Sequence, residues 1–475
     1  MLQRVVPVAV LGALAAARCA GAPAPAAAIQ RLTLAAPATA DRAARVAAWN
    51  RQFAAAQRFE VALAGLPVAA GAAAPSLEQV ARLLAPGLPA LHLLWLDLGD
   101  VPALARLGHL RPLGDLAARS RYDLKRFMPV ALQPAYGFDE QLYALPEEVE
   151  ARQVYFNRRH FEEAAIDYRR AGFDFEAPLM TWEALRRADL DLAAAPRASQ
   201  RLAFHPGHEG APLELWFWQQ GATALARGGR QATFAGPLQV EALAWLVAHA
   251  RELGGPARLA AAGSFPPPAR TGGPADDPDH HPFLAGRVSI CFESTRFVST
   301  VAVASPDFPL GWVEPPRRRP GAPLVSWSRA WGYALASGAP DGAWAPLAFL
   351  ISEEAALSGA AAAAPADQGA GEAGRNSATA TVRWFPAFTG QLAVDLHLAA
   401  RYRTGIKGLD DARDHGLQQL RHAHFRRPCP APPAVWDLLA AARRRAIGGE
   451  ASAAEALSDA EREAQARLDA AWAAR

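Results

Sequence analysis

Lysine, cysteine and methionine are scarce in this chain. Lys125 and Lys407 are the only lysines among 49 basic residues, and 46 acidic residues nearly balance them to a net charge of +3. No block of five or six like charges occurs, whereas a nucleic-acid groove usually needs a denser basic stripe. We therefore expect no nucleic-acid partner. The preference for Arg over Lys, together with many Ala and Pro residues, indicates a coding bias rather than a function.

Long apolar stretches are also missing. The run from Val5 to Leu14 is too short for a transmembrane helix, which needs about 20 residues. Arg4 before this run and small residues after it are typical of a secretory signal peptide. We predict that residues 1 to 28 are a signal peptide and an Ala/Pro tether, and that the protein is periplasmic or otherwise extracytoplasmic. Cys19 leaves a lipid anchor open, although a lipoprotein signal needs a small residue where Arg18 stands.

Only Cys291 and Cys429 remain after the predicted signal peptide. In an oxidising compartment two cysteines can form one disulfide. The sequence does not give their separation in space, so a disulfide and two buried free thiols both stay open.

Strand and helix patterns alternate from residue 30 onward. Residues 30 to 34 and 60 to 64 have the alternation of strands, with helical spacing over residues 40 to 59 between them. Ser76 is a good capping residue for a further helix, and residues 90 to 95 form a continuous apolar strand of the kind buried in a parallel sheet. This order predicts an α/β protein.

The alternation continues to residue 355, and the chain is helical from Pro432 onward. Repeated strand and helix units favour parallel or mixed sheets covered by helices on both faces. At 475 residues the chain is long enough for two or three globular units, and two lobes fit best. Residues 263 to 282 and 360 to 380 have the composition of surface loops.

Three patterns resemble known sites but lack the required context. The G-x-G-x-x-G at residues 369 to 374 follows an Ala-rich loop instead of a strand. Pro206 and Gly207 break the helix that a zinc motif over residues 205 to 209 would need. Residues 276 to 281 read as a solvated loop tip. No catalytic signature occurs, so we expect no enzyme, no cofactor and no metal ion.

Four groups of residues carry a resemblance to a known family. They are residues 93–97 (LLWLD) with 107–115, residues 142–146 (LYALP) with 150–157, residues 181–185 (TWEAL) and residues 283–290. In their order and spacing the chain resembles the family 1 extracellular solute-binding proteins of ABC importers, which include maltose-binding and glycerol-phosphate-binding proteins. The resemblance extends from residue 30 to the end.

The resemblance implies a two-lobed, periplasmic-binding-protein-like (type II) α/β fold with a ligand cleft between the lobes. The N-terminal lobe is expected at residues 29–149 plus about 331–372. The C-terminal lobe is expected at residues 150–330 plus about 373–475. The family also implies a membrane permease as partner, and we expect a monomer.

Trp95 and Asp97 follow a buried strand and match positions that hold a stacking ring and a hydroxyl-binding carboxylate in sugar-binding relatives. Trp95 is equally suited to the core, and Asp97 to capping the next helix. Glu150 lies seven residues before Asn157, as the pocket glutamate does in maltose-binding relatives. Its alternative role is a hinge ion pair with Arg152.

The resemblance suggests further ligand positions, with weaker support. Glu209 matches a polar pocket position. Ser294 stands where many relatives carry a stacking Trp, and its alternative is a helix cap. Arg329 and Trp331 occupy a segment that replaces the family's Gly-rich crossover. Trp436 begins the final helical region as a stacking aromatic does in relatives, with core packing as its alternative.

These residues favour capture of a sugar or sugar-like ligand for import. A first alternative is a phosphorylated polyol such as glycerol 3-phosphate, held by Arg329, Arg383 or Arg443. A second is an exported carbohydrate-active enzyme that uses Asp97 and Glu150 as paired carboxylates. A third is a sensor or scaffold derived from the same family, since residues 293–296 and 326–332 depart from its pattern.

Overall fold

The computed structural model describes most of the chain. The described residues are 28–66, 75–85, 88, 90–174, 176, 180–195, 201–208, 210–261, 281–363, 380–381 and 385–474. The predicted signal peptide up to residue 27, Cys19, Glu209, Arg383 and the Gly motif at 369–374 lie outside them. Within the described residues no helix is long and apolar enough to cross a membrane.

The N-terminal part is built from three strands and the helices between them. Strand β1 (Gln30–Ala36) pairs in parallel with β2 (Phe59–Gly65) and with β3 (Leu93–Asp97), as the alternating patterns predict. The helix expected over residues 40 to 59 is two, α1 (Ala40–Gln52) and α2 (Ala54–Gln57), because Phe53 leaves the helical conformation. Helix α3 (Leu77–Leu83) begins at a capping box that Ser76 forms with Gln79.

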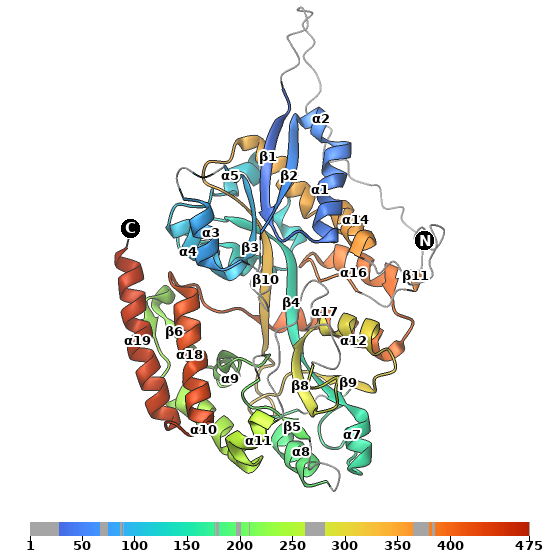
Figure 1. Cartoon of the computed structure of the whole chain (residues 1–475), viewed down its shortest axis with the longest axis vertical. Helices are drawn as coiled ribbons and strands as arrows, with labels where there is room; N and C mark the ends of the chain where they lie inside the picture. Colours follow the sequence, from blue (N-terminus) through green and yellow to red (C-terminus); the bar gives the residue numbers. More distant parts are fainter. Residues whose placement is uncertain are drawn as a thin grey trace, which may run out of the picture.

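Two long strands connect the upper and lower parts of the molecule (Figure 1). They are β4 (Ala144–Asn157) and β10 (Ser326–Leu335), which pair antiparallel. With β8 (Val288–Ser294) and β5 (Leu202–Phe204), the strand order is β2-β1-β3-β10-β4-β8-β5, so the sheet is mixed and continuous through both parts. Gly332 sits at a bulge of β10, where an added Cβ would lie 2.1 Å from the Leu145 carbonyl oxygen. Only glycine fits this approach.

The remaining strands are short. They are β6 (Leu225–Ala226), β7 (Gln231–Ala232), β9 (Leu310–Val313), β11 (Ala380–Thr381), β12 (Tyr402–Arg403) and β13 (Ala423–His424). Further α-helices complete the described fold. They are α4 (Val101–Arg106), α5 (Gly114–Arg119), α6 (Pro129–Leu132), α7 (Arg158–Glu163), α8 (Trp182–Ala194), α9 (Leu213–Gln219), α10 (Pro237–Glu252), α11 (Gly255–Ala261), α12 (Phe297–Ala304), α13 (Trp344–Leu350), α14 (Glu353–Ala363), α16 (Leu392–Arg401), α17 (Lys407–Gln419), α18 (Pro432–Ile447) and α19 (Ala453–Ala473).

Two large hydrophobic cores meet along the long strands. One core contains β1, β3, the first part of β4 up to Ala151 and the part of β10 from Ala330 onward. The other contains β4 from Val154, helices α8 to α10, Trp327, and the C-terminal helices. The lobe boundaries expected from the sequence, at 149/150 and 330/331, fall within these same two strands.

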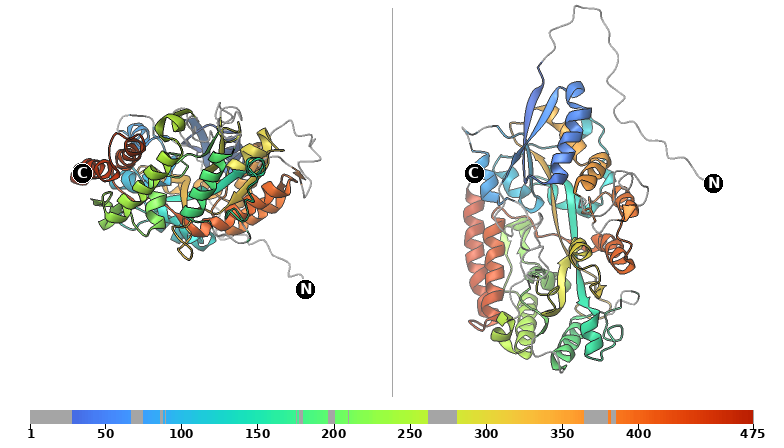
Figure 2. Two further views of the ribbon diagram at one scale, coloured as in Figure 1. Left: turned by 90° about the horizontal axis from the view of Figure 1, so that it is seen from below. Right: turned by 45° about the vertical axis from the view of Figure 1, so that its right-hand side comes forward.

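Helices α18 and α19 lie side by side along one flank of the molecule (Figures 1 and 2). The end of α19 reaches the N-terminal part. There Arg106 of α4 donates hydrogen bonds to the carbonyl oxygens of Trp472 and Ala474 at 2.6 and 2.7 Å. The ring of Phe138 packs on Trp472, with 4.7 Å between ring centroids. The C-terminal helix therefore joins the two parts away from the sheet.

Cys291 and Cys429 are both free and fully buried. They belong to different hydrophobic clusters, and burial raises the pKa of the Cys429 thiol to about 12. Of the two alternatives that the sequence leaves open, the structure contains the pair of buried thiols.

Candidate functional site

Strand register gathers charged and aromatic side chains where the two parts meet. Trp331 on β10 opposes Asp97 on β3, and Arg329 on β10 opposes Glu150 on β4. Arg152 on β4 opposes Ser294 on β8. Directly opposed residues share a face of the sheet, as do residues two apart on one strand. We call this the crossover face; its residues are Asp97, Glu150, Arg152, Ser294, Trp327, Arg329 and Trp331.

Asp97 both binds an arginine and caps a helix. Its Oδ2 accepts a hydrogen bond from Arg329 at 2.6 Å, and its Oδ1 accepts one from the backbone N–H of Gly99 at 2.9 Å. The Gly99 bond caps the short 3-10 helix η1 (Leu98–Asp100). Burial and the nearby Asp97 charge raise the pKa of Asp100 to about 8, and Arg329 acts against that rise.

Glu150 lies in a buried ion network with Arg152. The Arg152 guanidinium is 3.0 Å from Glu150 and 3.2 Å from Glu293, and all three side chains are at least nine-tenths buried. Burial by itself raises the pKa of Glu293, but His208, His281 and Arg152 outweigh it, so that pKa lies well below its usual range. The ion pair with Arg152, one of the two roles considered for Glu150, is present.

Trp95 and Trp331 are almost fully buried in the N-terminal core. The Trp95 indole N–H donates to Glu147 at 2.5 Å, and the Arg42 guanidinium lies 3.8 Å from its ring centre. The Arg329 guanidinium lies 4.9 Å from the Trp331 ring. Cations therefore cover both rings in this conformation, and their stacking on a ligand stays a prediction.

Trp436, Arg426 and Glu214 form a second group, which contacts the crossover face at Trp327. The Arg426 guanidinium lies 5.0 Å from the Trp436 ring and 5.7 Å from the Trp327 ring. Arg426 also donates to the buried carboxylate of Glu214 at 2.5 Å. Trp436 is 7% exposed and packs in the second core, so it combines an aromatic face near Arg426 with its alternative role in the core.

Sequence reasoning missed Arg426 and Glu214, and it preferred Trp331 to Trp327 among the rings of residues 326–332. Arg426 is brought in by β13, which pairs with β10 through Trp327 and His424. That strand has only two residues, so it leaves no alternating pattern to find. Trp327 lies in the segment noted for its departure from the family, which was the one available signal.

Two other candidate residues, Ser294 and Arg443, are buried, and only Arg443 uses its side chain in hydrogen bonds to described residues. Ser294 is completely buried at the end of β8, and its hydroxyl has no hydrogen-bond partner among the described residues. Arg443 is buried on α18 and donates to the carbonyl oxygens of His208 and Ala211 at 3.1 and 2.7 Å. Arg443 therefore holds the loop before α9.

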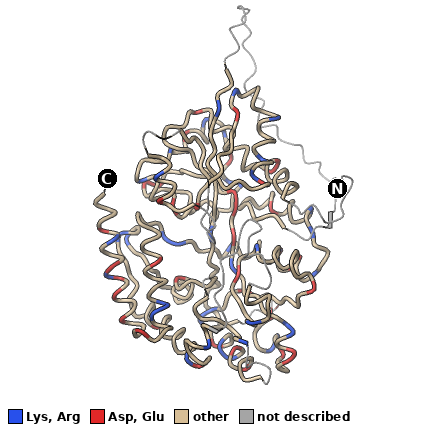
Figure 3. The backbone as a smooth tube through the Cα atoms, in the orientation of Figure 1, with Lys and Arg blue, Asp and Glu red and all other residues tan. Residues whose placement is uncertain are grey.

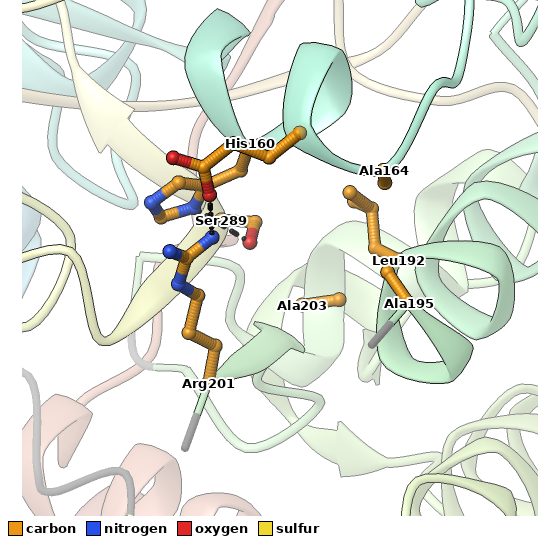
Figure 4. Close-up of a pocket in the computed structure, with 8 residues that line it drawn as sticks. His160, Ala164, Leu192, Ala195, Arg201, Ala203 and Ser289 are labelled. Atoms are coloured by element: carbon orange, nitrogen blue, oxygen red, sulfur yellow. Dashed lines mark hydrogen bonds and ion pairs between the residues drawn. The ribbon is translucent and has the colours of Figure 1, made fainter. Parts of the chain in front are cut away.

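A small cavity lies apart from the crossover face, between α7, α8 and β5 (Figure 4). His160 and Arg201 lie on one side of it, and Leu192 and Ala195 on the other. The His160 ring is hydrogen-bonded to Ser289 at 2.9 Å, and burial lowers its pKa to about 4. The space holds at most about one water molecule. It is too small for a sugar.

Charge is distributed evenly over the molecule. Basic and acidic residues are interspersed over both parts, as Figure 3 shows. In the part of the chain that the structure describes, no group of three or more His, Cys, Asp or Glu side chains is arranged to hold a metal ion.

The fold is similar to that of solved sugar-binding proteins, although no family model and no curated protein sequence matches this chain. An ABC substrate-binding protein from Listeria monocytogenes in complex with cycloalternan gives a TM-score of 0.67 at 15% identity, covering 92% of this chain and 98% of that one. A cyclic α-maltosyl-1,6-maltose binding protein from Arthrobacter globiformis gives 0.64 at 17% identity, covering 92% and 99%.

Maltose-bound MalE3 of T. maritima gives a TM-score of 0.64 at 16% identity, covering 92% of this chain and 100% of that one. The first two are binding proteins, and the third was solved with maltose bound. The resemblance inferred from the sequence is thus confirmed at the level of architecture: the chain has the two-lobed α/β fold of ABC-importer sugar-binding proteins.

Proposed function

We propose that this protein is the extracytoplasmic solute-binding component of an ABC importer and binds a sugar between its two lobes. The observation that carries the proposal is the match of nearly the whole chain to binding proteins whose structures contain cycloalternan or maltose. The crossover face supports it, because its polar and aromatic groups lie where the two cores meet.

The chemistry of this region suits a saccharide. Flat rings such as Trp436 and Trp327 pack against C–H patches of a sugar, while carboxylates and guanidinium groups bind its hydroxyls. Asp97 and Glu214 are each held by an arginine, so their oxygens are already oriented. Oriented groups lose less conformational entropy when ligand binds.

The pairing of charges favours a neutral ligand over a phosphorylated polyol. Arg329 is bound to Asp97, Arg426 to Glu214, and Arg152 to Glu150 and Glu293. Arg443 is engaged by backbone carbonyls. A phosphate would have to displace one of these carboxylates, or lie next to it and be repelled.

The ligand is proposed to be captured by closure of the two lobes around it. The lobes are proposed as residues 29–149 plus about 331–372 and residues 150–330 plus about 373–475, hinged at β4 and β10. A ligand that contacts both lobes favours the closed arrangement only by those added contacts. No bond is broken, so the protein is proposed to be a binder and not an enzyme. It would act as an exported monomer, released or lipid-anchored at Cys19, and present ligand to a membrane permease.

A thermal-shift panel tests this proposal. Maltose, mannotriose and cycloalternan are compared with glycerol 3-phosphate, because a ligand that binds only the folded state raises the melting temperature by mass action. We expect at least one neutral saccharide to raise it and glycerol 3-phosphate to leave it unchanged. Product analysis after long incubation provides the enzymatic control, since any cleavage of the saccharide contradicts a pure binding role.

A further inference from the structure

Three neighbouring residues of the crossover face carry buried hydrogen-bond donors without acceptors. They are Trp327, Arg152 and Ser294, whose Nε1, Nε and Oγ atoms have no hydrogen-bond partner among the described residues. Trp327 is 6% exposed, Arg152 4% and Ser294 0%. Buried polar atoms in native proteins nearly always have a hydrogen-bond partner, so we expect each of these three atoms to bind one.

The three donors are adjacent. The Arg152 guanidinium lies 4.7 Å from the centre of the Trp327 ring, and Ser294 opposes Arg152 across the β4–β8 pair. The three residues therefore follow one another across the neighbouring strands β10, β4 and β8. The terminal nitrogens of Arg152 contact Glu150 and Glu293, which leaves its Nε without a hydrogen-bond partner among the described residues.

We propose that this donor row, the side chains of Trp327, Arg152 and Ser294, is a ligand subsite that binds uncharged acceptor oxygens of a saccharide, such as ring, glycosidic or hydroxyl oxygens. This inference rests on the proposed function and specifies which residues determine recognition. The subsite takes an uncharged oxygen because Glu150 and Glu293 flank Arg152 and repel an anion. A sugar oxygen supplies the acceptors that the described residues do not provide.

Four single variants test the donor row. Trp327→Phe and Ser294→Ala each remove one donor and keep most of the packing. Arg152 is left intact because two buried carboxylates depend on it. Trp216→Phe and Ser328→Ala are matched controls, since each also removes a buried polar atom without a hydrogen-bond partner. Trp216 lies on α9, and Ser328 follows Trp327 on β10 and so points to the opposite face.

The measurements are the melting temperature without ligand and the Kd for maltose, mannotriose and cycloalternan. Without ligand, Ser294→Ala and Ser328→Ala should be as stable as wild type or slightly more stable, since each removes an unpartnered buried hydroxyl. Trp327→Phe and Trp216→Phe should both be less stable than wild type by similar amounts, because each leaves a small cavity in the same core. For the probe that wild type binds best, Trp327→Phe and Ser294→Ala should raise Kd about tenfold, the loss of about one hydrogen bond. The two controls should leave Kd within about twofold of wild type.

Equal Kd values for the test and control variants would overturn the donor row alone. A melting temperature that falls further in Trp327→Phe than in Trp216→Phe, and further in Ser294→Ala than in Ser328→Ala, would also overturn it, because the donors would then hold a structural water. If wild type binds none of the three probes, the proposed function fails separately, and the ligand-free melting temperatures still decide whether the donors lack partners.

Discussion

Arg152 lies between two buried carboxylates, with Glu150 at 3.0 Å and Glu293 at 3.2 Å. One guanidinium thus neutralises carboxylates of both β4 and β8. Removing it would leave both carboxylates without their nearest cation, whereas removing either carboxylate would cost Arg152 only one of its two contacts.

Arg152→Met should therefore lower the free energy of unfolding by about 3–5 kcal/mol, the usual result of breaking a buried pair. Urea unfolding measures this. Arg186→Met is the matched control, because Arg186 pairs with the more exposed Glu183 and Glu252 and should change stability by less than about 1 kcal/mol. Similar losses in both variants would mean that the Arg152 network is not a structural centre.

The pair formed by Arg329 and Asp97 is more accessible, with side chains 36% and 20% exposed. A double-mutant cycle with Arg329→Met and Asp97→Asn should give a coupling energy of about 0.5–1 kcal/mol.

For a neutral saccharide, Kd should change less than about twofold between about 0.05 M and about 0.5 M NaCl, since no ligand charge is screened. A steep salt dependence that Arg329→Met abolishes would point instead to an anionic ligand.

Trp436 should matter for ligand as well as for packing. Trp436→Phe keeps an aromatic ring but shortens the surface next to Arg426, so we expect a Kd about three- to tenfold higher, measured by calorimetry. Trp245→Phe provides the comparison, because Trp245 packs against Trp182 and Trp216 inside the C-terminal part. If both variants weaken binding equally, the effect is general loosening of the core.

Asp100 should make stability depend on pH. Its pKa is about 8 in the folded protein against an ordinary 3.8, mainly because of burial and of Asp97. Between these values the folded state holds a proton that the unfolded state releases, so stability falls as pH rises from about 4 to about 8. Asp100→Asn removes this contribution, and its melting temperature should exceed that of wild type increasingly toward pH 8. Parallel curves for the two proteins would contradict the raised pKa.

Local patterns predicted the parts of the fold that depend on local sequence. Strands β1 and β2, the cap at Ser76, and the helix that begins at Pro432 all follow from periodicity and capping chemistry. The helix break at Phe53 was missed, since nothing in the apolar spacing of residues 40 to 59 marks it.

Pairings distant in sequence could not be predicted in this way. The polar partners of the site arise from antiparallel contacts of β10 with β3 and β4, which place Arg329 beside Asp97 and Glu150. The periodicity of apolar residues shows which side chains of a strand face the core, but it does not show which other strand pairs with it. The position of Asp97 at a strand end was therefore predictable from the sequence, whereas its pairing with Arg329 was not.

The most direct test of the central claim is a crystal structure of the protein with the saccharide that stabilises it most. We predict electron density for the sugar where the two parts meet, with its oxygens within hydrogen-bond distance of the crossover face and a ring packed on Trp327 or Trp436. Density confined to another surface, with the crossover face unchanged and without ligand, would contradict the account.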